Sequence, residues 1–311
     1  MNAILNYPIV SVIIPTYNRA NDLTRAIQSI INQTFTDYEI IVIDNHSIDN
    51  TDLVVQNFND TRINLHKIHN NGVIAASRNL GIKKSKGKYI AFLDSDDWWL
   101  PGKLEESVKA LENGADIVYH DLYLVTSNNQ KIYWRKVKSR KVHSPVFKDL
   151  LLDGDALPNS SVVFRKEIID KVGFLSEEIQ LVAWEDFDFW LRISKITEKF
   201  FRIQKTFGYY WEGGGNISNE KRTLRILEDF LIRYKEGLGF DKEGKVKVPW
   251  WVKYAISKIH FRRKNYLESY LELKQINSIP KNYYFKITVL KILSFILSNF
   301  SFLIIKNETQ R

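Results

Sequence analysis

The sequence predicts an α/β fold in which a mostly parallel sheet carries helices on both faces. Short apolar runs such as Val10–Ile14, Glu39–Asp44 and Tyr89–Leu93 alternate with segments whose apolar residues recur at helical spacing. Strands separated by helices favour parallel pairing, because each crossover helix packs back on the sheet. The length of 311 residues and the 44% content of hydrophobic residues suffice for one large domain with an appendage.

The predicted elements follow one another closely in the first hundred residues. The strand Val10–Ile14 ends at Pro15, and Asn21–Gln33 then has the apolar spacing of a helix. After the strand Glu39–Asp44 we expect a helix, a strand, a helix and a strand at residues 51–58, 64–68, 74–85 and 89–93. Residues 1–101 therefore have the alternation of strands and helices that is typical of a parallel sheet covered on both faces.

Residues 102–241 have a mixed pattern, which we expect to extend the same sheet. The pattern predicts two strands around a turn at Ser127–Asn129, a short third strand and one helix, at residues 117–125, 130–137, 161–164 and 184–194. The loop Glu212–Asn216 is too rich in glycine for a regular element, and it is expected to be a mobile flap or a tight turn.

The basic charge of the chain is concentrated near its C-terminus. The whole chain has 45 Lys and Arg against 36 Asp and Glu, but Lys242–Arg311 alone has 14 against four. Residues 1–241 are thus nearly neutral, and we predict a domain boundary between residues 241 and 242. The charge alone would also fit a nucleic-acid-binding protein, although such a protein has no need of clustered carboxylates at strand ends.

The basic C-terminal tail, residues 242–311, is predicted to be helical and rich in aromatic residues. In residues 287–305, polar side chains recur three or four positions apart and form one stripe on an apolar helix: Thr288, Lys291, Ser294, Ser298 and Ser301. An interfacial helix on an anionic membrane fits this pattern, and packing within the chain, an oligomer interface and a membrane span are the alternatives.

Three strand ends in the first half carry polar groups, and the sharpest of them is Asp94-Ser95-Asp96-Asp97. Carboxylates this close repel one another unless a cation joins them or water screens them. Mg²⁺ and Mn²⁺ favour such oxygen ligands, supplemented by substrate phosphates and water. The alternative is a solvated turn that caps the next helix. The other polar strand ends, Thr16–Arg19 and Asp44–Asn45, would lie at the same edge of a parallel sheet.

The composition excludes several kinds of chemistry. The chain has no cysteine, so it has no disulfide, no thiolate nucleophile and no thiolate metal site. Its six histidines lack helical metal-ligand spacing, and none is assigned to catalysis. Residues 1–8 lack the pattern of a signal peptide, and we expect an unsecreted, cytoplasmic protein at the inner face of the cell membrane.

Five segments in order resemble the family 2 glycosyltransferases, over roughly residues 8–215. They are Val10–Arg19, Ile41–Asn45, Ala76–Ile82, Gly87–Asp97 and Trp184–Asp186. The resemblance implies the GT-A fold, with a Rossmann-like mostly parallel sheet in residues 1–241. Its nucleotide-binding half is about residues 1–101, and its acceptor-binding half is about residues 102–241. It also implies an inverting enzyme that uses a nucleotide-sugar donor and a divalent metal ion, Mn²⁺ or Mg²⁺.

The resemblance assigns roles to residues of the nucleotide-binding half. It implies that Pro15, Thr16, Tyr17 and Arg19 hold the nucleoside and diphosphate, with a stacking face on Tyr17 and a cation on Arg19. The side chains of Asp44 and Asn45 match the position that reads the base. Relatives often have a second acid where Asn45 stands, so uridine and thymidine diphosphate sugars both remain open.

The same resemblance places the metal, the sugar and the catalytic base. Asp96 is expected to bind the metal with help from Asp94, while Asp94 and Ser95 also contact the donor and Arg78 lies near the diphosphate. It implies that Asp186 is the base that deprotonates the acceptor hydroxyl, with Glu185 as a neighbouring acid. Many relatives carry Arg and His in the loop after this helix, and this chain has neither there.

Together these features predict a transferase that adds one sugar to a glycan acceptor. We expect the acceptor to be a lipid-linked precursor of a surface polysaccharide, because the tail is basic and aromatic. A soluble acceptor, a protein acceptor or a processive synthase are alternatives within the class. An inactive sugar-nucleotide-binding protein of the same fold is a further alternative, against which the intact Asp94, Asp96 and Asp186 argue.

Overall fold

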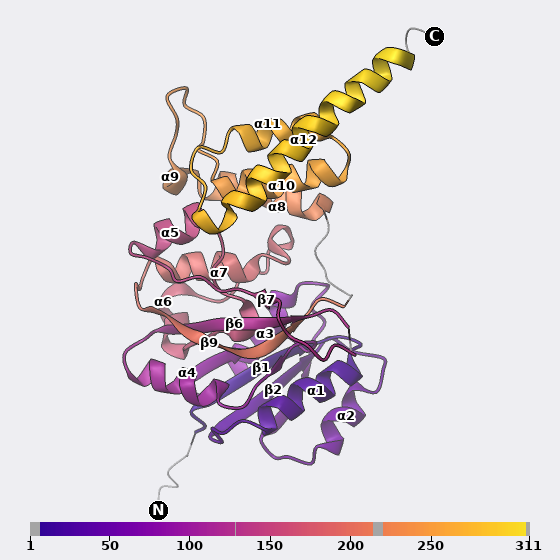
Figure 1. Ribbon diagram of the computed structural model, residues 1–311. Coiled ribbons are helices and arrows are strands. Elements are labelled where there is room, and N and C mark those ends of the chain that lie inside the picture. Colours follow the sequence, from indigo (N-terminus) through magenta and orange to yellow (C-terminus); the bar gives the residue numbers. More distant parts are fainter. Residues whose placement is uncertain (1–6, 128, 214–219, 309–311) are drawn as a thin grey trace, which may run out of the picture. The chain divides into compact units, whose positions relative to one another are not determined.

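The computed structural model describes residues 7–127, 129–213 and 220–308, with side chains as far as Asn299 (Figure 1). Its elements form two compact units. The first, which we call the sheet unit, comprises residues 1–147 and 155–217. The second, the helical unit, comprises residues 148–154 and 218–311.

The sheet unit is built on one nine-stranded sheet with the order β3-β2-β1-β4-β8-β6-β9-β5, and β7 pairs with β6 beside this path. Strands β3, β2, β1 and β4 are mutually parallel, which confirms the pairing expected for the first half. The bounds are β1 Val10–Thr16, β2 Tyr38–Asp44, β3 Ile63–Lys67, β4 Tyr89–Phe92, β5 Trp98–Trp99, β6 Ile117–Val125, β7 Lys136–Val137, β8 Val163–Arg165 and β9 Phe200–Trp211.

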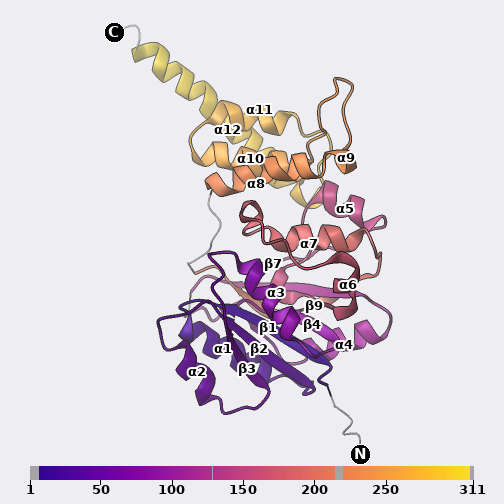
Figure 2. The ribbon, with the colours of Figure 1, turned by 180° about the vertical axis from the view of Figure 1, so that it is seen from behind.

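Helices cover both faces of the parallel strands (Figures 1 and 2). On one face, Val12 and Ile14 of β1 pack with residues of α1 and α4. On the other face, Ile13 meets α3 at Gly81, where an added Cβ would lie 2.4 Å from the Ile13 side chain. Both faces of β1 are therefore buried, and this explains why its sequence is apolar except for Ser11 and Thr16. The helices of this unit are α1 Ala20–Ile31, α2 Thr51–Asn57, α3 Ile74–Lys84, α4 Lys103–Glu112, α6 Ile169–Val172 and α7 Glu185–Ser194.

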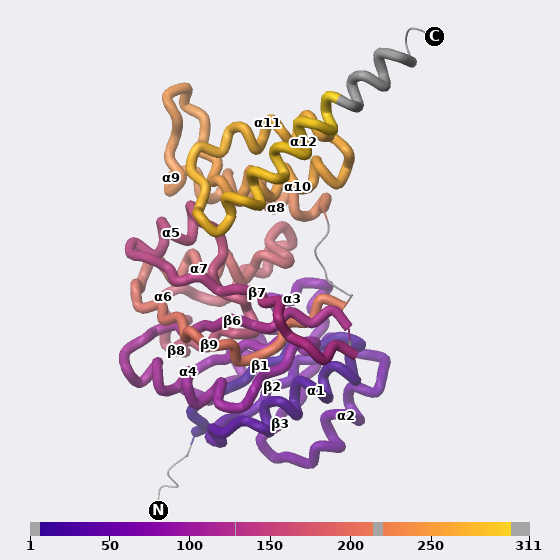
Figure 3. Tube along the Cα trace, viewed as in Figure 1, coloured from indigo at the N-terminus to yellow at the C-terminus, as the bar shows by residue number. Residues whose placement is uncertain are grey.

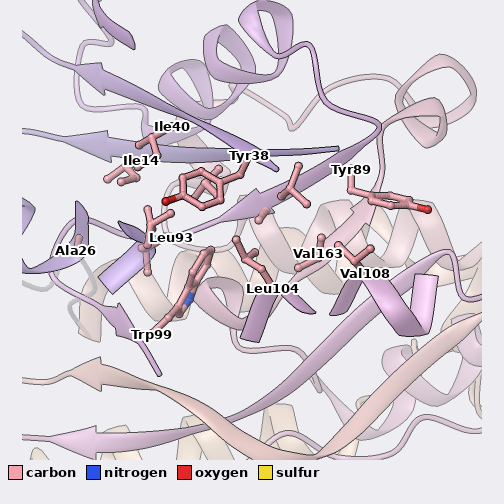
Figure 4. Packing of buried hydrophobic residues seen from close by; sticks show 14 of the residues in the cluster. Ile14, Ala26, Tyr38, Ile40, Tyr89, Leu93, Trp99, Leu104, Val108 and Val163 are labelled. Carbon is pink, nitrogen blue, oxygen red and sulfur yellow. The ribbon is translucent and has the colours of Figure 1, made fainter. Parts of the chain in front are cut away.

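The main core lies between the sheet and helices α1 and α4 (Figure 4). Leu23 and Ile27 of α1 and Leu104 of α4 are completely buried there. Trp99 of β5 closes this core, because the sheet curls until its last strand packs against α1. The alternating strands and helices of the sequence thus produce a sheet that encloses its own core on one side.

The second half of the sheet is mixed, as expected. Strand β8 is antiparallel to both β4 and β6, so β6 has the same direction as β4. Strand β9 is parallel to β6. As a result, Val125 and Trp211, at the ends of β6 and β9, lie at the same edge of the sheet as Asp94, which follows β4.

The structure corrects three details of the expected elements. The strand predicted at 130–137 is only Lys136–Val137, because the Gln130 side chain bonds to the carbonyls of Leu124 and Ile132 where a ladder would form. Pro15 and Thr16 belong to β1 and not to the loop that follows it. The long strand β9 was missed. In the glycine-rich loop predicted at Glu212–Asn216, residues 214–216 lie outside the described residues.

The helical unit begins before the change in composition at Lys242, because α8 already packs in it. Successive helices α10, α11 and α12 pack against one another, as the tube in Figure 3 shows. The ring of Trp251 lies 5.0 Å from that of Phe230 and against Gly154. The bounds are α5 Val146–Asp153, which continues from the sheet unit, α8 Glu220–Arg233, α9 Lys235–Leu238, α10 Trp250–Arg262, α11 Tyr266–Lys274 and α12 Lys281–Glu308.

Helix α12 turns part of its polar stripe inward. The hydroxyls of Ser294 and Ser269 lie 2.9 Å apart in the interior of the helical unit. Large apolar side chains of the same helix are exposed, among them Phe285 at 77%, together with Ile292 and Phe295. Within the described residues, no helix has both the length and the apolar character that crossing a membrane requires.

Candidate active site

The predicted site residues lie at the edge where strands β1, β2 and β4 end. Because these strands are parallel, Thr16, Asp44 and Asp94 come to the same edge of the sheet. After β4 the backbone alternates, so that Asp94 and Asp96 remain partly exposed whereas Ser95 and Asp97 are buried. The alternation therefore presents two of the carboxylates outward and turns the third inward.

Arg78 joins the two groups of acids that the sequence places far apart. It lies on α3 and is only 3% exposed. Its Nη2 bonds to Asp94 Oδ1 at 2.7 Å, and its Nη1 bonds to Glu185 Oε1. Burial tends to lower the pKa of Arg78, but the carboxylates around it outweigh burial and raise that pKa. A permanently charged guanidinium thus links the end of β4 to the start of α7.

Glu185 also holds the backbone at the start of α7. Its Oε2 accepts the Ala183 N–H at 2.7 Å. Ala183 has a φ of +77°, a left-handed conformation that is unfavourable for alanine. Glu185 therefore fixes a strained turn, and this turn sets the direction in which the next residue, Asp186, points. Glu185 thus adjoins Asp186 and holds the turn before it, and a role of either residue in catalysis remains a prediction.

Asp186 is partly buried at the first turn of α7, where its Oδ1 accepts the Phe187 N–H at 2.8 Å. Burial is the main cause that raises the pKa of Asp186 well above its usual range, and the charge of Glu185 adds to it. The positive charge of Arg78 opposes this shift. A carboxylate with a raised pKa accepts a proton more readily than an exposed aspartate does.

Asp96 lies beside Arg19, which comes from the loop after β1. Arg19 Nη1 is 3.3 Å from Asp96 Oδ2 and 3.2 Å from Asp22. Burial raises the pKa of Asp96 to about 6, and the negative charge of Asp94 adds to the effect. Arg19 reduces the shift without cancelling it. Because Arg19 also pairs with Asp22, and Arg78 also pairs with Glu185, the two arginines do not fully neutralise Asp94 and Asp96.

Asp97 connects this cluster to β9, a role that the sequence did not reveal. Its Oδ1 accepts the Trp211 N–H at 2.8 Å, and its other oxygen has no hydrogen-bond partner in the described part of the chain. Burial and the charge of Asp96 raise its pKa well above the usual range. Ser160 supports the same segment, because its Oγ accepts the Asp94 N–H at 3.1 Å.

Two cationic side chains pack against tryptophans next to the cluster, and both were missed. Arg25 lies 3.9 Å from the ring centre of Trp98 and donates to the Asp96 carbonyl at 2.9 Å. Lys103 is completely buried, with its Nζ 3.7 Å from the ring centre of Trp99. Burial lowers the pKa of Lys103 well below its usual range. The order of residues gives no signal for such contacts, since each depends on how far the sheet curls.

The side chains expected to read a base take part in hydrogen bonds of the protein. Asp44 is completely buried, and its carboxylate accepts from Ser47 and, at 2.6 Å, from Lys67 Nζ. Asn45 Oδ1 accepts the Asn70 N–H at 2.9 Å, and the second lone pair of this oxygen could accept one more hydrogen bond. Both residues shape the loops around the edge, and their contact with a base remains a prediction.

The loop after β1 is tied to the loop after β2. The Asn18 N–H donates to Ser47 Oγ at 2.8 Å, and Asn18 Oδ1 accepts the Ile48 N–H at 2.9 Å. Asn18 has a φ of +51°, so the chain turns sharply after Tyr17. Tyr17 is exposed, which suits the stacking face expected of it. Pro15 and Thr16 are buried at the end of β1, directly before this loop. Their contact with a nucleoside remains a prediction.

The carboxylates at the end of β4 suit a hard divalent cation that takes its remaining ligands from a substrate and from water. No group of three His, Asp or Glu residues suited to a metal ion occurs among the residues that the structure describes. Mg²⁺ and Mn²⁺ commonly take one or two carboxylates and complete their shell with phosphate oxygens and water. Asp96 and Asp94 supply such a pair, and their surplus negative charge favours a cation.

We predict that Arg78→Met destabilises the protein strongly. The methionine keeps the length of the side chain but leaves Asp94 and Glu185 without their cation, which costs about 3–5 kcal/mol when such a pair is buried. The free energy of unfolding from urea denaturation measures the effect. Arg62→Met is the control, because its pair with Asp60 lies at the surface and contributes about 1 kcal/mol or less. Equal losses in the two variants would contradict the role given to Arg78.

The family model that matches the chain is described as glycosyl transferase family 2, and it covers residues 11–173, more than half of the chain. An uncharacterised glycosyltransferase of Rickettsia prowazekii is 32% identical over 203 residues, which are 62% of this chain and 61% of that protein. The chain thus spans about three fifths of the length of the first curated relatives it matches.

A relative from Escherichia coli has a more specific name. It is the UDP-Glc:α-D-GlcNAc-diphosphoundecaprenol β-1,3-glucosyltransferase WfgD, 32% identical over 188 residues, with 60% of this chain and 70% of that protein covered. Its sequence identity and coverage establish a family relationship. The name describes the activity of WfgD alone.

Two solved structures share the fold. The S. aureus TarS fragment in complex with UDP-GlcNAc has a TM-score of 0.57 and 16% identity, with 92% of this chain and 89% of that chain covered. The mannosyltransferase PcManGT of Pyrobaculum calidifontis, in complex with GDP-Man and Mn²⁺, has a TM-score of 0.56 and 15% identity, covering 94% and 85%. These likenesses confirm the predicted GT-A fold. The family model and the relative from Escherichia coli show that the chain belongs to glycosyl transferase family 2.

Proposed function

We propose that the protein is an inverting glycosyltransferase that moves one sugar from a nucleotide-diphosphate sugar to a hydroxyl group of a glycan acceptor. The observation that carries the proposal is the link through Arg78 between two different acid groups. Asp94 stands beside Asp96 at the end of β4, and Glu185 stands beside Asp186 at the start of α7. One group suits a diphosphate with its metal, and the other suits a proton acceptor.

The donor would be held at the edge of the sheet by an aromatic ring, by a cationic side chain and by carboxylates. Tyr17 offers an exposed ring to the base, while Arg19 places a cation beside Asp96. Asp96 and Asp94 would hold Mn²⁺ or Mg²⁺, which neutralises the negative charge that grows on the leaving diphosphate. In this arrangement Arg78 keeps Asp94 oriented, and Ser95 and Asn45 lie along the donor.

Asp186 would take the proton of the acceptor hydroxyl as that oxygen attacks the anomeric carbon. A direct displacement needs one base on the side opposite the departing nucleotide, and no covalent intermediate. The raised pKa of Asp186 suits this role, and Glu185 fixes the turn that aims it. Uridine diphosphate sugars are the donors we favour, with thymidine diphosphate sugars as the alternative, because Asn45 retains an acceptor oxygen.

We further propose a lipid-linked acceptor and a peripheral position at the membrane. The name of WfgD, a relative that acts on a diphosphoundecaprenol-linked sugar, supports the first point. The exposed apolar side chains of α12, Phe285, Ile292 and Phe295, support the second, since an apolar helix face beside lysines suits the boundary of an anionic membrane. A dimer that buries the same face is the alternative.

The catalytic proposal predicts that two aspartates fail in different ways. With a panel of UDP-, dTDP- and GDP-sugars and Mn²⁺ or Mg²⁺, we expect nucleotide release from one donor. Asp96→Ala should lose metal-dependent donor binding, measured by titration calorimetry. Asp186→Asn should keep donor binding and lose nucleotide release by about 10²–10⁴-fold, the usual share of a general base.

Asp170→Asn is the matched control, because Asp170 is an exposed aspartate of α6 and should leave both quantities unchanged. Near-normal release by Asp186→Asn would show that another group is the base. Donor binding without any nucleotide release, whether the sugar is offered an acceptor or only water, would instead support an inactive sugar-nucleotide-binding protein. Absence of metal-dependent donor binding from the whole panel would contradict the transferase assignment.

The tail proposal predicts a loss of membrane binding when the α12 face becomes polar. Phe285→Ser combined with Ile292→Ser should lower recovery of the full chain with phosphatidylglycerol vesicles by at least about ten-fold, because burial of each side chain contributes about 1.5–3 kcal/mol. Ile232→Ser, at another exposed apolar residue of the helical unit, should have no effect. Unchanged recovery together with a smaller mass in light scattering would show a dimer interface instead.

A further inference from the structure

A second basic surface lies in the sheet unit, outside the C-terminal tail. Residues 131–141, which we call the basic strap, contain six Lys and Arg. The chain has no Asp or Glu from residue 122 to residue 148, the stretch that contains the strap. A segment this uniformly charged needs anionic partners from elsewhere, since none is supplied by its neighbours in sequence.

The strap is held along the last part of β6, beyond the residues that pair with β8, where the label β7 stands in Figure 1. Strand β7 pairs Lys136 with Tyr123, and the Leu124 N–H donates to the Arg135 carbonyl at 2.9 Å. The ring of Tyr133 packs edge-on against Tyr209 of β9 at 4.8 Å. These contacts fix the backbone, so the side chains that point away from the sheet have a defined direction.

Two large apolar side chains of the strap point into solvent. Ile132 is 74% exposed and Trp134 is 76% exposed, on either side of the inward-facing Tyr133. Exposed apolar residues are common singly, but these two stand together among lysines and arginines. Within the described residues, no carboxylate forms an ion pair with Lys131, Arg135, Lys136, Lys138 or Lys141.

The strap ends at an amphipathic pocket of about 540 Å³. Lys141 lines this pocket with Lys109 of α4 and Lys205 of β9, and the exposed ring of Phe201 forms part of its wall. Of the three lysines, Lys205 is paired with Glu106. The pocket therefore combines unpaired positive charge with an apolar wall, which suits a phosphate group attached to an apolar chain.

We propose that the basic strap docks on an anionic lipid surface, with Ile132 and Trp134 in the headgroup boundary and the bases against lipid phosphates. Tryptophan with an aliphatic neighbour and flanking lysines is the composition that partitions to this boundary. A polyanionic glycan or a nucleic acid would use the bases, but it gains nothing from an exposed isoleucine. Lipid therefore accounts for both halves of the surface.

The position of the strap connects this surface to the active site. Trp134 stands beside the end of β6, which has the same direction as β4, so both lie at the edge that carries Asp94. Docking through the strap would bring that edge to the membrane. The benefit of this placement rests on the proposed function, because only a transferase with a lipid-linked acceptor gains from it. The docking of the strap on lipid does not depend on that function.

A fluorescent label on the strap tests the proposal independently of the tail. The chain has no cysteine, so Ile132→Cys gives one site for an environment-sensitive dye in the full-length protein. With vesicles of phosphatidylglycerol and phosphatidylcholine we expect a blue shift of the emission, weaker at high salt. Phosphatidylcholine alone should give little shift. The same dye at Leu53→Cys, an exposed position of α2, should not respond.

Neutralising the strap should weaken this response. Arg135→Gln and Lys138→Gln should each lower the partition measured by the Ile132 label about five-fold, because a base at an anionic surface contributes about that factor. Lys86→Gln and Lys171→Gln, two exposed lysines elsewhere in the sheet unit, are the matched controls. Nucleotide release from a soluble donor should stay unchanged in all four variants, so failure of docking and failure of the transferase assignment are told apart.

Two results would overturn the proposal. One is a silent label at position 132 while the full chain sediments with the same anionic vesicles, since the tail alone would then make the contact. The other is a shift with a soluble polyanion, such as polyphosphate or a nucleic acid, that anionic vesicles do not reproduce. In that case the strap would be a site for a polyanion.

Discussion

The geometry of the site depends on one buried guanidinium. Arg78 has a carboxylate on each side, Asp94 from β4 and Glu185 from α7, and these residues are far apart in the chain. Without a cation between them, the buried Glu185 and the partly exposed Asp94 would repel one another and draw in water. With Arg78 in place, the end of β4 and the start of α7 are held together. Glu185 also accepts the Ala183 N–H, so the strained turn before α7 is tied to the same guanidinium.

Much of this architecture could be predicted from the sequence. The parallel strands can be recognised in the sequence because both of their faces are buried, which favours largely apolar runs such as Val10–Ile14, where Ser11 is the single polar residue. Their polar ends could be assigned to one edge, since parallel direction fixes which end of each strand meets the next. Asp94, Asp96, Glu185 and Asp186 were found in this way or through the family resemblance. Their mutual contacts through Arg78 needed the structure.

The remaining features depend on contacts between distant segments, for which a single sequence has no periodic signal. Strand β9 pairs with β6 across irregular register shifts, and Trp211 reaches Asp97 only because the sheet curls. Lys103 has the sequence environment of an ordinary helix start, yet it is completely buried against Trp99. The basic strap was hidden for a different reason. Its charge balances the acids of residues 1–121, so the net charge of the sheet unit gave no sign of it.

In the mechanism proposed above, the carboxylates at the end of β4 hold the metal of a nucleotide-sugar donor. Anomalous diffraction from crystals of the protein with UDP and Mn²⁺ tests it most directly. We expect a manganese peak bonded to Asp96 and to the diphosphate, with Arg78 still paired to Asp94 and Glu185. A manganese peak remote from Asp94 and Asp96, or nucleotide bound at this edge without manganese, would contradict the claim.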